Sequence, residues 1–219
     1  MRPPFADRAD AGRSLGERLA DPPRPDAVVL GLPRGGVIVG AEIARAIGAP
    51  LDLLLVRKIG LPGQPELAMG AIAALGDVIE EVRSEDVLLR SGTRPEQFAQ
   101  VRVDEEKELR RREAAYRGGD PPVAVRGRAV ILADDGLATG ATMRAAVAAA
   151  RGAGAGRITV AVPVASPRAC ERLAAEVDEV VCLWAPASFR AVQQGYADFA
   201  ETTDAEVRAA LAAARPEDA

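Results

Sequence analysis

The strongest constraint on the fold is a junction in the middle of the chain, where an apolar run meets two adjacent carboxylates and a loop of small residues. The apolar run is Ala129–Ala133 and the carboxylates are Asp134 and Asp135; the loop comprises Gly136, Leu137, Ala138, Thr139, Gly140, Ala141 and Thr142. Five consecutive apolar residues are typical of a buried strand, and the alanine-rich stretch from Gly140 to about residue 152 favours a helix. In open α/β sheets, ligands bind where such strands end and helices begin. The junction therefore predicts both a fold class and the place of a site.

Similar units recur along the chain. Apolar runs at 28–32, 51–56, 67–75, 158–164 and 180–183 are interspersed with helical patterns at 11–19, 37–47, 94–117 and 168–176. Residues 60–63 predict a loop, and the Glu- and Arg-rich residues 94–117 predict a solvated helix with i,i+4 ion pairs. Because buried strands that alternate with helices are covered on both faces, we expect the α/β class with a doubly wound parallel sheet.

The charge and residue content exclude several functional classes. A net charge of −4 and a pI near 5.1 argue against a broad surface for nucleic acid or anionic membranes. No apolar stretch approaches the roughly 18 residues that span a bilayer, and residues 1–10 are too charged for the apolar part of a secretory signal, so we expect a cytoplasmic protein. The chain has no histidine, which excludes a zinc site and a histidine general base. Cys170 and Cys182 lack CxxC spacing and are expected to fill the core.

The residue types at the junction suit a phosphorylated sugar. Small residues let backbone N–H groups approach an anion, Thr139 and Thr142 add hydroxyl donors, and a helix N-terminus contributes its positive end. Two carboxylates beside such a phosphate cradle would repel a phosphate unless they face hydroxyl groups or a cation. A sugar phosphate with its cation satisfies both halves of the junction.

Three other interpretations of the junction each require particular residues in the sequence. In the simplest one, Asp134 and Asp135 cap the helix and the glycines close a tight turn. A receiver-type acidic pocket needs a lysine on a later strand, and neither Lys58 nor Lys107 follows this strand. A Walker loop is excluded because residues 31–36 are not followed by Lys and Ser or Thr.

The stretch from Val130 to Thr142 resembles the signature of type I phosphoribosyltransferases that binds 5-phosphoribosyl 1-pyrophosphate (PRPP). The sequence of residues 134–143, DDGLATGATM, is similar to that found in a bacterial branch of predicted phosphoribosyltransferases. The resemblance implies that Asp134 and Asp135 are catalytic residues that hold the ribose hydroxyls. It also implies that residues 136–142 bind PRPP and that Mg²⁺, supported by PRPP oxygens and the two aspartates, is the cofactor.

Two further segments resemble parts of the same family. Leu32, Pro33, Arg34, Gly35 and Gly36 are similar to its pyrophosphate loop; Arg57 and Lys58, followed by residues 61–63, are similar to its arginine-lysine segment and mobile lid. The resemblance implies that Arg34 and Lys58 stabilise the departing pyrophosphate, and that Gly35, Gly36 and Arg57 bind PRPP. Lys58 is one of only two lysines, which independently suggests a specific task. The alternatives are an ordinary glycine turn and chance placement of a lysine on a solvated loop.

Aromatic residues gather near the end of the chain. Trp184, Phe189 and Tyr196 lie in a segment that resembles the base-binding hood of hypoxanthine-type enzymes, with Phe199 close behind. Such rings can stack on a planar base, or they can simply close the end of the core. We therefore predict one domain over residues 1–219, with a core at about 26–183, a helical insertion at about 84–118 and a small C-terminal hood at about 184–203.

The resemblance implies a homodimeric transferase in which a nitrogen of a nucleobase-like acceptor displaces pyrophosphate from Mg-PRPP. Hypoxanthine-type enzymes carry an aspartate as proton acceptor where this chain has Ala138, so the resemblance does not extend to a 6-oxopurine acceptor. Two other functions stay open. One is a regulator or sensor that binds PRPP or a nucleotide without turnover, and the other is partner binding through the helix at 94–117.

Overall fold

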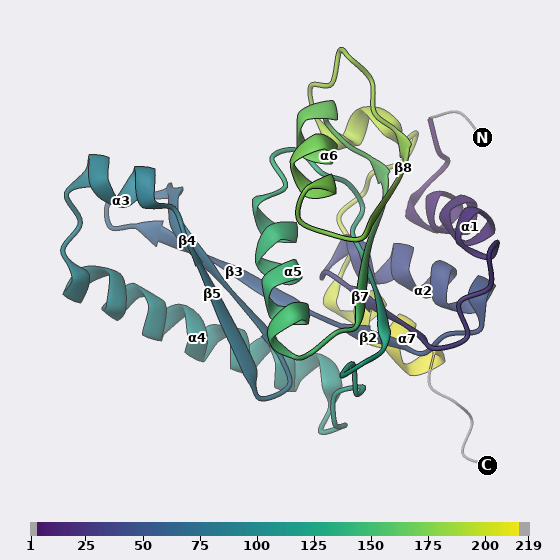
Figure 1. Cartoon of the computed structure of the whole chain (residues 1–219), viewed down its shortest axis with the longest axis horizontal. Helices are drawn as coiled ribbons and strands as arrows, with labels where there is room; N and C mark the ends of the chain where they lie inside the picture. Colours follow the sequence, from purple (N-terminus) through teal and green to yellow (C-terminus); the bar gives the residue numbers. More distant parts are fainter. Residues whose placement is uncertain (1–3, 215–219) are drawn as a thin grey trace.

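Five parallel strands form the central sheet in the order β2-β1-β6-β7-β8 (Figure 1). They are β1 (Ala27–Gly31), β2 (Leu51–Leu53), β6 (Ala129–Ala133), β7 (Arg157–Val164) and β8 (Glu179–Trp184). If these five strands are renumbered 1 to 5 in chain order, their order across the sheet is 2-1-3-4-5. This is one of the common orders of doubly wound sheets. The computed structural model, which describes residues 4–214, thus confirms the predicted fold class. The domain predicted for residues 1–219 extends beyond the described residues at both ends.

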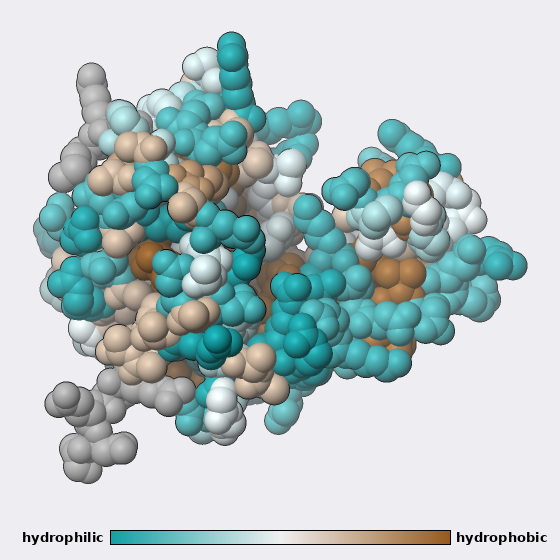
Figure 2. Space-filling model, turned by 180° about the vertical axis from the view of Figure 1, so that it is seen from behind, coloured by the Kyte–Doolittle hydropathy of each residue, from teal (hydrophilic) through white to brown (hydrophobic). Residues whose placement is uncertain are grey.

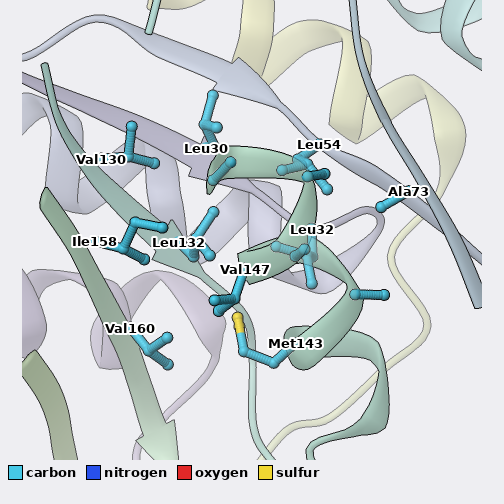
Figure 3. Close-up of a cluster of buried hydrophobic side chains, with 14 of the residues drawn as sticks. Leu30, Leu32, Leu54, Ala73, Val130, Leu132, Met143, Val147, Ile158 and Val160 are labelled. Atoms are coloured by element: carbon cyan, nitrogen blue, oxygen red, sulfur yellow. The ribbon is translucent and has the colours of Figure 1, made fainter. Parts of the chain in front are cut away.

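Helices cover both faces of this sheet (Figure 1). α1 (Arg8–Leu19) and α2 (Gly35–Ile47) lie on one face and α5 (Ala141–Gly152) and α6 (Pro167–Ala174) on the other, while α7 (Asp204–Ala213) packs beside α2. Strand side chains alternate between the faces, so Val28 and Leu30 join the core around α5 whereas Val29 joins the core around α2. Figure 3 shows the first of these cores, in which side chains of β1, β6 and β7 meet Met143 and Val147 of α5.

Most predicted elements are present with shifted ends. The helix predicted at 11–19 is α1, which begins earlier because Asp7 caps it, and the patterns at 158–164 and 168–176 correspond to β7 and α6. The sequence patterns did not predict α7. Cys170 and Cys182 are free thiols that are half-buried against the core around α5, as expected for residues that fill space.

Residues 55–117 leave the central sheet and form an arm. β3 (Leu55–Leu61), β4 (Gln64–Leu75) and β5 (Val78–Arg83) make an antiparallel sheet, which is followed by α3 (Glu85–Ser91) and α4 (Pro95–Arg117). The prediction of one strand over 51–56 is therefore wrong. The N–H of Leu54 still donates to the carbonyl of Gly31 at 3.1 Å, and the chain then pairs with β4 instead.

The loop predicted at 60–63 is shorter than expected. β3 and β4 pair as far as Leu61 and Gln64, so only Pro62 and Gly63 form the turn of this hairpin. Gly63 has a φ of +82°, a conformation that favours glycine. The turn-forming residues were recognised, but strand pairing extends into them.

Ion pairs cover one side of α4 and apolar contacts the other. Glu108 binds Arg111 at 2.7 Å and Arg112 at 2.9 Å, as predicted for an ion-paired helix. The opposite side buries Phe98 and Leu109 in the core that also contains β3. α4 is therefore solvated on one side only.

The arm stands away from the body of the molecule and its surface is largely hydrophilic (Figure 2). The three large apolar side chains that are exposed within residues 4–214 all lie on it: Leu67 of β4, Leu89 of α3 and Val103 of α4. Within residues 4–214, no helix has both the length and the apolar content needed to cross a membrane.

A buried ion pair joins the base of the arm to the edge of the central sheet. Nη1 of Arg117, at the end of α4, donates to both carboxylate oxygens of Asp52 in β2, at 2.6 and 2.8 Å. The backbone N–H of Val123 donates to the same carboxylate at 2.8 Å. The side chains of Arg117 and Asp52 are only 9% and 7% exposed. Arg117 also pairs with Glu113 of α4, from Nε to Oε1 at 3.3 Å, so it lies between two buried carboxylates. The charge of Asp52 is poorly solvated and depends on Arg117.

Candidate active site

The carboxyl ends of β1 and β6 lie side by side in the central sheet. Gly31 and Ala133 are paired in register, and the N–H of Leu32 donates to the carbonyl of Ala133 at 2.9 Å. β1 continues into α2 on one face and β6 into α5 on the other, so the two connections diverge here. Doubly wound sheets bind ligands at this point. The loops at 32–36 and 134–142 therefore leave the sheet at one ligand-binding edge.

Loop 32–36 lies directly on the acidic pair. A Cβ atom at Gly36 would stand 2.5 Å from the carbonyl oxygen of Ala133 and 2.9 Å from Cα of Asp134. A Cβ atom at Gly35 would stand 2.0 Å from Oδ2 of Asp135. Only glycine allows this approach. The structure thus brings together the two segments that the sequence identified separately.

Replacing Gly36 by alanine is expected to disrupt this contact, because the new methyl group meets backbone atoms that cannot move alone. We expect the free energy of unfolding to fall by about 3 kcal/mol, near the upper end for overpacking. Gly40→Ala is the matched control on α2. The three atoms nearest to its Cβ would all belong to side chains, those of Leu51, Val29 and Ala133 at 3.2, 3.3 and 3.5 Å, and alanine favours the helix. Urea unfolding measures both, and equal effects would contradict the proposed close approach.

The two carboxylates have different surroundings. Oδ1 of Asp134 accepts from the backbone N–H of Asp135 at 2.8 Å, and Oδ2 of Asp135 accepts from Nε of Arg8 at 2.7 Å. The other oxygen of each carboxylate takes part in no hydrogen bond among residues 4–214. Burial, and then the charge of Asp135, raises the pKa of Asp134 well above its usual range; the Asp135 N–H and Arg8 offset only part of this. A carboxylate with a strongly raised pKa is more common at functional sites than elsewhere.

Asp134→Asn is therefore expected to stabilise the fold at neutral pH. A pKa that is higher in the folded than in the unfolded state means that the protonated acid favours folding. That contribution is present below about pH 4 and is lost as the pH rises through the folded-state pKa. Asparagine never ionises, so the variant should be more stable than the wild type at pH 8, and the difference should shrink toward pH 4. Urea unfolding at several pH values checks this, and a destabilised variant at pH 8 would contradict it.

The segment after β7 holds the loop that follows the acidic pair. Leu137 donates its N–H to the carbonyl of Val164 at 2.9 Å. Ser166 donates its N–H to the carbonyl of Leu137 at 2.8 Å and its hydroxyl to the carbonyl of Ala138 at 2.7 Å. These bonds fix the loop from behind, while Ala138 and Thr139 are exposed.

Gly140 is the N-cap of α5, with a φ of +78°, so the cap residue offers no side-chain acceptor to the first turn. The nearest hydroxyl is Oγ1 of Thr139, 3.4 Å from the N–H of Ala141. The alternative in which Asp134 and Asp135 cap this helix is therefore wrong. The N-terminus of α5 keeps donors for an anion, as expected of a phosphate cradle.

Lys58 and Arg57 point to opposite faces of the arm sheet, as neighbours in a strand must. Lys58 is exposed and lines a cavity of about 200 Å³ together with Ala141 and Thr142 of the cradle. Arg57 forms an ion pair with Glu105 of α4 on the other face. The structure thus brings Lys58, but not the guanidinium of Arg57, to the predicted phosphate loop.

Arg34 lies at the predicted loop, but its guanidinium contacts the C-terminal part of the chain. It forms an ion pair with Glu201, and Asp204 lies 4.0 Å from Nη1. The Arg34 side chain is 40% exposed and that of Glu201 78%, so this is a surface pair.

The predicted base-binding aromatics divide into two groups. Tyr196 is only 7% exposed, and its ring packs between Phe5 and Phe199 with centroid distances of 6.0 and 4.9 Å. Its hydroxyl donates to the backbone carbonyl of Asp135 at 2.6 Å. Tyr196 therefore closes the core beneath the acidic pair, which is the alternative that the sequence left open. Trp184 and Phe189 are half-buried at the edge of the same cluster.

Sequence reasoning missed Arg8, which reaches the site from α1. Besides its bond to Asp135, its Nη1 donates to the carbonyl of Ala200 at 2.6 Å. No motif surrounds it, and it is 127 residues away from Asp135 along the chain. Only the fold brings the two together.

Comparison with known proteins agrees with this geometry. A family model described as phosphoribosyl transferase domain matches residues 9–197. Proteins of Mycobacterium tuberculosis strains CDC 1551 / Oshkosh and H37Rv, both provisionally named phosphoribosyl transferases, are 47% identical over 209 residues, which is 94% of this chain. The chain spans only 46% of the length of these relatives.

A solved structure matches the whole architecture. The crystal structure of TT1426 from Thermus thermophilus is 46% identical and has a TM-score of 0.81, and the match covers 96% of this chain and 98% of that one. The family model covers most of the chain, and the acidic pair and the predicted phosphate cradle lie where doubly wound sheets bind ligands. The chain belongs to the phosphoribosyl transferase family.

Proposed function

We propose that the protein transfers the 5-phosphoribosyl group of Mg-PRPP to a nitrogen of a nucleobase-like acceptor and releases pyrophosphate. One observation carries the proposal: the acidic pair, the glycine loop and the open N-terminus of α5 converge where β1 and β6 end. A ligand that fills this edge needs hydroxyl groups that bind the carboxylates and an anionic group on each side of these hydroxyls. PRPP has this arrangement, because its ribose hydroxyls lie between the 5-phosphate and the pyrophosphate.

Each part of PRPP then has a defined partner. The 5-phosphate lies on the N–H groups and hydroxyls of residues 137–142, and the ribose hydroxyls donate to the open oxygens of Asp134 and Asp135. The pyrophosphate lies on loop 32–36, in which Arg34 is exposed while Gly35 and Gly36 are buried against the acidic pair. The close packing of the two loops supports this order, because neighbouring groups of one ligand need neighbouring sites.

The acidic pair fits a magnesium ion that is shared with the ligand. Mg²⁺ prefers oxygen ligands, keeps several waters and is commonly held by one or two carboxylates together with phosphate oxygens. Asp134 and Asp135 supply two carboxylates, and residues 4–214 contain no group of three or more acidic, histidine or cysteine side chains that could hold a metal ion by themselves. A site made by the protein and PRPP together matches this donor set. When bound, the ion would offset the charge of the pyrophosphate.

Two cationic side chains are available to the phosphate groups of PRPP. Lys58 faces the cradle across the cavity of about 200 Å³, and Arg34 lies beside the glycine loop. Arg34 must first leave Glu201, which costs little because exposed ion pairs contribute only about 0–1 kcal/mol. Arg34 then stabilises charge that develops on the leaving group as the C–O bond breaks. Lys58 faces the residues assigned to the 5-phosphate, so it can share in this task only after the arm moves it toward loop 32–36.

The acceptor site is proposed at the segment after β8, with Trp184 and Phe189 as the stacking residues. Both rings are half-buried and thus partly accessible, unlike Tyr196. Ala138 offers no proton acceptor, so the preferred acceptor has a nitrogen that does not need deprotonation by that side chain. Ala138 is also the observation that favours a sensor, which would bind PRPP through the same cradle without turnover.

Calorimetric titration with PRPP, with and without Mg²⁺, tests the binding step. A screen for pyrophosphate release across purine and pyrimidine bases then tests turnover. Binding that requires Mg²⁺, with release for one base, is the expected result. Binding without release for any base would favour the sensor, and no binding would refute the proposal. Size-exclusion chromatography of the same sample tests the homodimer that the family resemblance implies.

A further inference from the structure

We propose that Arg8 is a positioning residue of the ribose site, which holds the carboxylate of Asp135 in its ligand-binding orientation. This inference rests on the proposed binding of PRPP. Nε of Arg8 donates to Oδ2 of Asp135 at 2.7 Å, and the two side chains are 13% and 20% exposed. The pair is therefore largely shielded from water, where an ion pair constrains geometry more than it does on the surface.

The guanidinium of Arg8 is itself fixed by two further contacts. Nη1 donates to the carbonyl of Ala200 at 2.6 Å, and the ring of Phe199 lies 3.9 Å from the guanidinium carbon. A planar group with a hydrogen bond on one edge and an aromatic ring on its face has little rotational freedom. Its third contact, with Asp135, therefore determines where Oδ2 lies and leaves Oδ1 for a ligand.

The backbone around Arg8 is anchored to the same part of the molecule. Phe5 donates its N–H to the carbonyl of Gly195 at 2.8 Å and accepts at its carbonyl from Ala197 at 2.7 Å. Residues 5–8 and 195–200, which we call the clasp, thus lie together beneath Asp135. The hydroxyl of Tyr196, within the clasp, supports the backbone of Asp135 from below.

Arg8 also resolves the conflict between two carboxylates and a phosphate. The charge of Arg8 offsets that of Asp135, so the acidic pair presents less negative charge to the phosphates on either side. A Cβ atom at Gly35 would stand 2.6 Å from Nε of Arg8, so the ion pair is also in contact with the proposed pyrophosphate loop. Arg8 lies under the point where the ribose and pyrophosphate parts of the site meet.

Arg8→Met and Arg8→Lys test this role by calorimetry with Mg-PRPP and with pyrophosphate, and thermal unfolding shows that each variant is folded. We expect Arg8→Met to weaken PRPP binding by roughly 10- to 100-fold, the range for loss of a hydrogen bond between charged groups. Pyrophosphate lacks ribose, so it should lose only the part of the effect that comes from the charge of Arg8, a smaller fold-change than for PRPP. Arg8→Lys keeps the charge and should recover part of the PRPP affinity. Arg13→Met, on an exposed arginine of the same helix, should bind like the wild type.

A second comparison distinguishes the positioning of Asp135 from a general loss of structure in the Arg8 variants. In an Asp135→Asn background, Arg8→Met should have little further effect on PRPP affinity, because the carboxylate that it positions is already gone. Additive losses would overturn the inference, as would equal losses for PRPP and pyrophosphate or unchanged affinity in Arg8→Met. If the wild type itself does not bind PRPP, the proposed function fails, and the inference fails with it. If the wild type binds and only the variants disagree, the inference alone is wrong.

Discussion

Replacing Asp134 and Asp135 together by asparagine is expected to lower the affinity for Mg-PRPP by at least about 100-fold, or roughly 2.7 kcal/mol. The variant loses the acceptors that we assign to the ribose hydroxyls and the two carboxylates that fit the metal. Hydrogen bonds to charged groups contribute about 1.5–3 kcal/mol each, so the loss of several makes this the largest effect on binding. Calorimetric titration of the purified variant measures it.

The fold should survive this double substitution. Asparagine has nearly the same shape, and the buried like charges that raise the pKa of Asp134 are removed. Asp21→Asn combined with Asp26→Asn is the matched control. Both aspartates are exposed, and their replacement removes the same amount of charge near the amino-terminal end of β1, opposite the site. The control should bind PRPP normally. If Asp134→Asn with Asp135→Asn is folded and binds with wild-type affinity, the site assignment is wrong.

Arg117→Met is expected to cause the largest loss of stability, about 3–5 kcal/mol, because it leaves the charge of Asp52 buried without its partner. Urea unfolding at pH 7 measures the change. Arg111→Met is the control on the same helix. That arginine is 67% exposed and pairs with Glu108 across one turn, so its loss should cost less than about 1 kcal/mol.

The same ion pair permits a second, independent comparison. Asp52→Asn combined with Arg117→Met also removes the charge of Asp52, and Glu113, the other carboxylate beside Arg117, keeps its ion pair with Arg110 at 2.9 Å. The double variant should therefore be more stable than Arg117→Met alone. A double variant as unstable as the sum of the two single variants would show that the pair acts through packing and not through charge.

The chemistry of the site could be predicted where it is local in sequence. β6, the acidic pair and α5 follow one another without interruption, so the apolar run, the two carboxylates and the small residues identified the whole unit. The neighbouring glycine loop was also visible. Its contact with Asp134 and Asp135 was not, because pairing between β1 and β6 joins segments that are about 100 residues apart, such as Gly31 and Ala133.

One prediction, a single strand over 51–56, is wrong, and other side chains lie where the sequence could not place them; the physical causes are of the same kind. An apolar run at 51–56 looks like one buried strand, because composition cannot show that Leu54 separates two sheets. Arg34 was expected to face the ligand, but a long side chain binds the nearest available anion, and Glu201 comes from a distant segment. Tyr196 and Trp184 looked equivalent in sequence. Only packing against Phe5, from the start of the described chain, distinguishes the buried ring from the accessible one.

The clasp implies an order of assembly during synthesis. The ribosome makes the amino-terminal end first, so Arg8 is available early, whereas Tyr196 lies 61 residues after Asp135. A nascent chain can pair β1 with β6 and still lack the support of its acidic pair. A chain interrupted before residue 195 should therefore keep most strands of the sheet but bind PRPP less tightly than the whole chain. Stabilisation by the ligand should accordingly be largest once translation has passed the clasp.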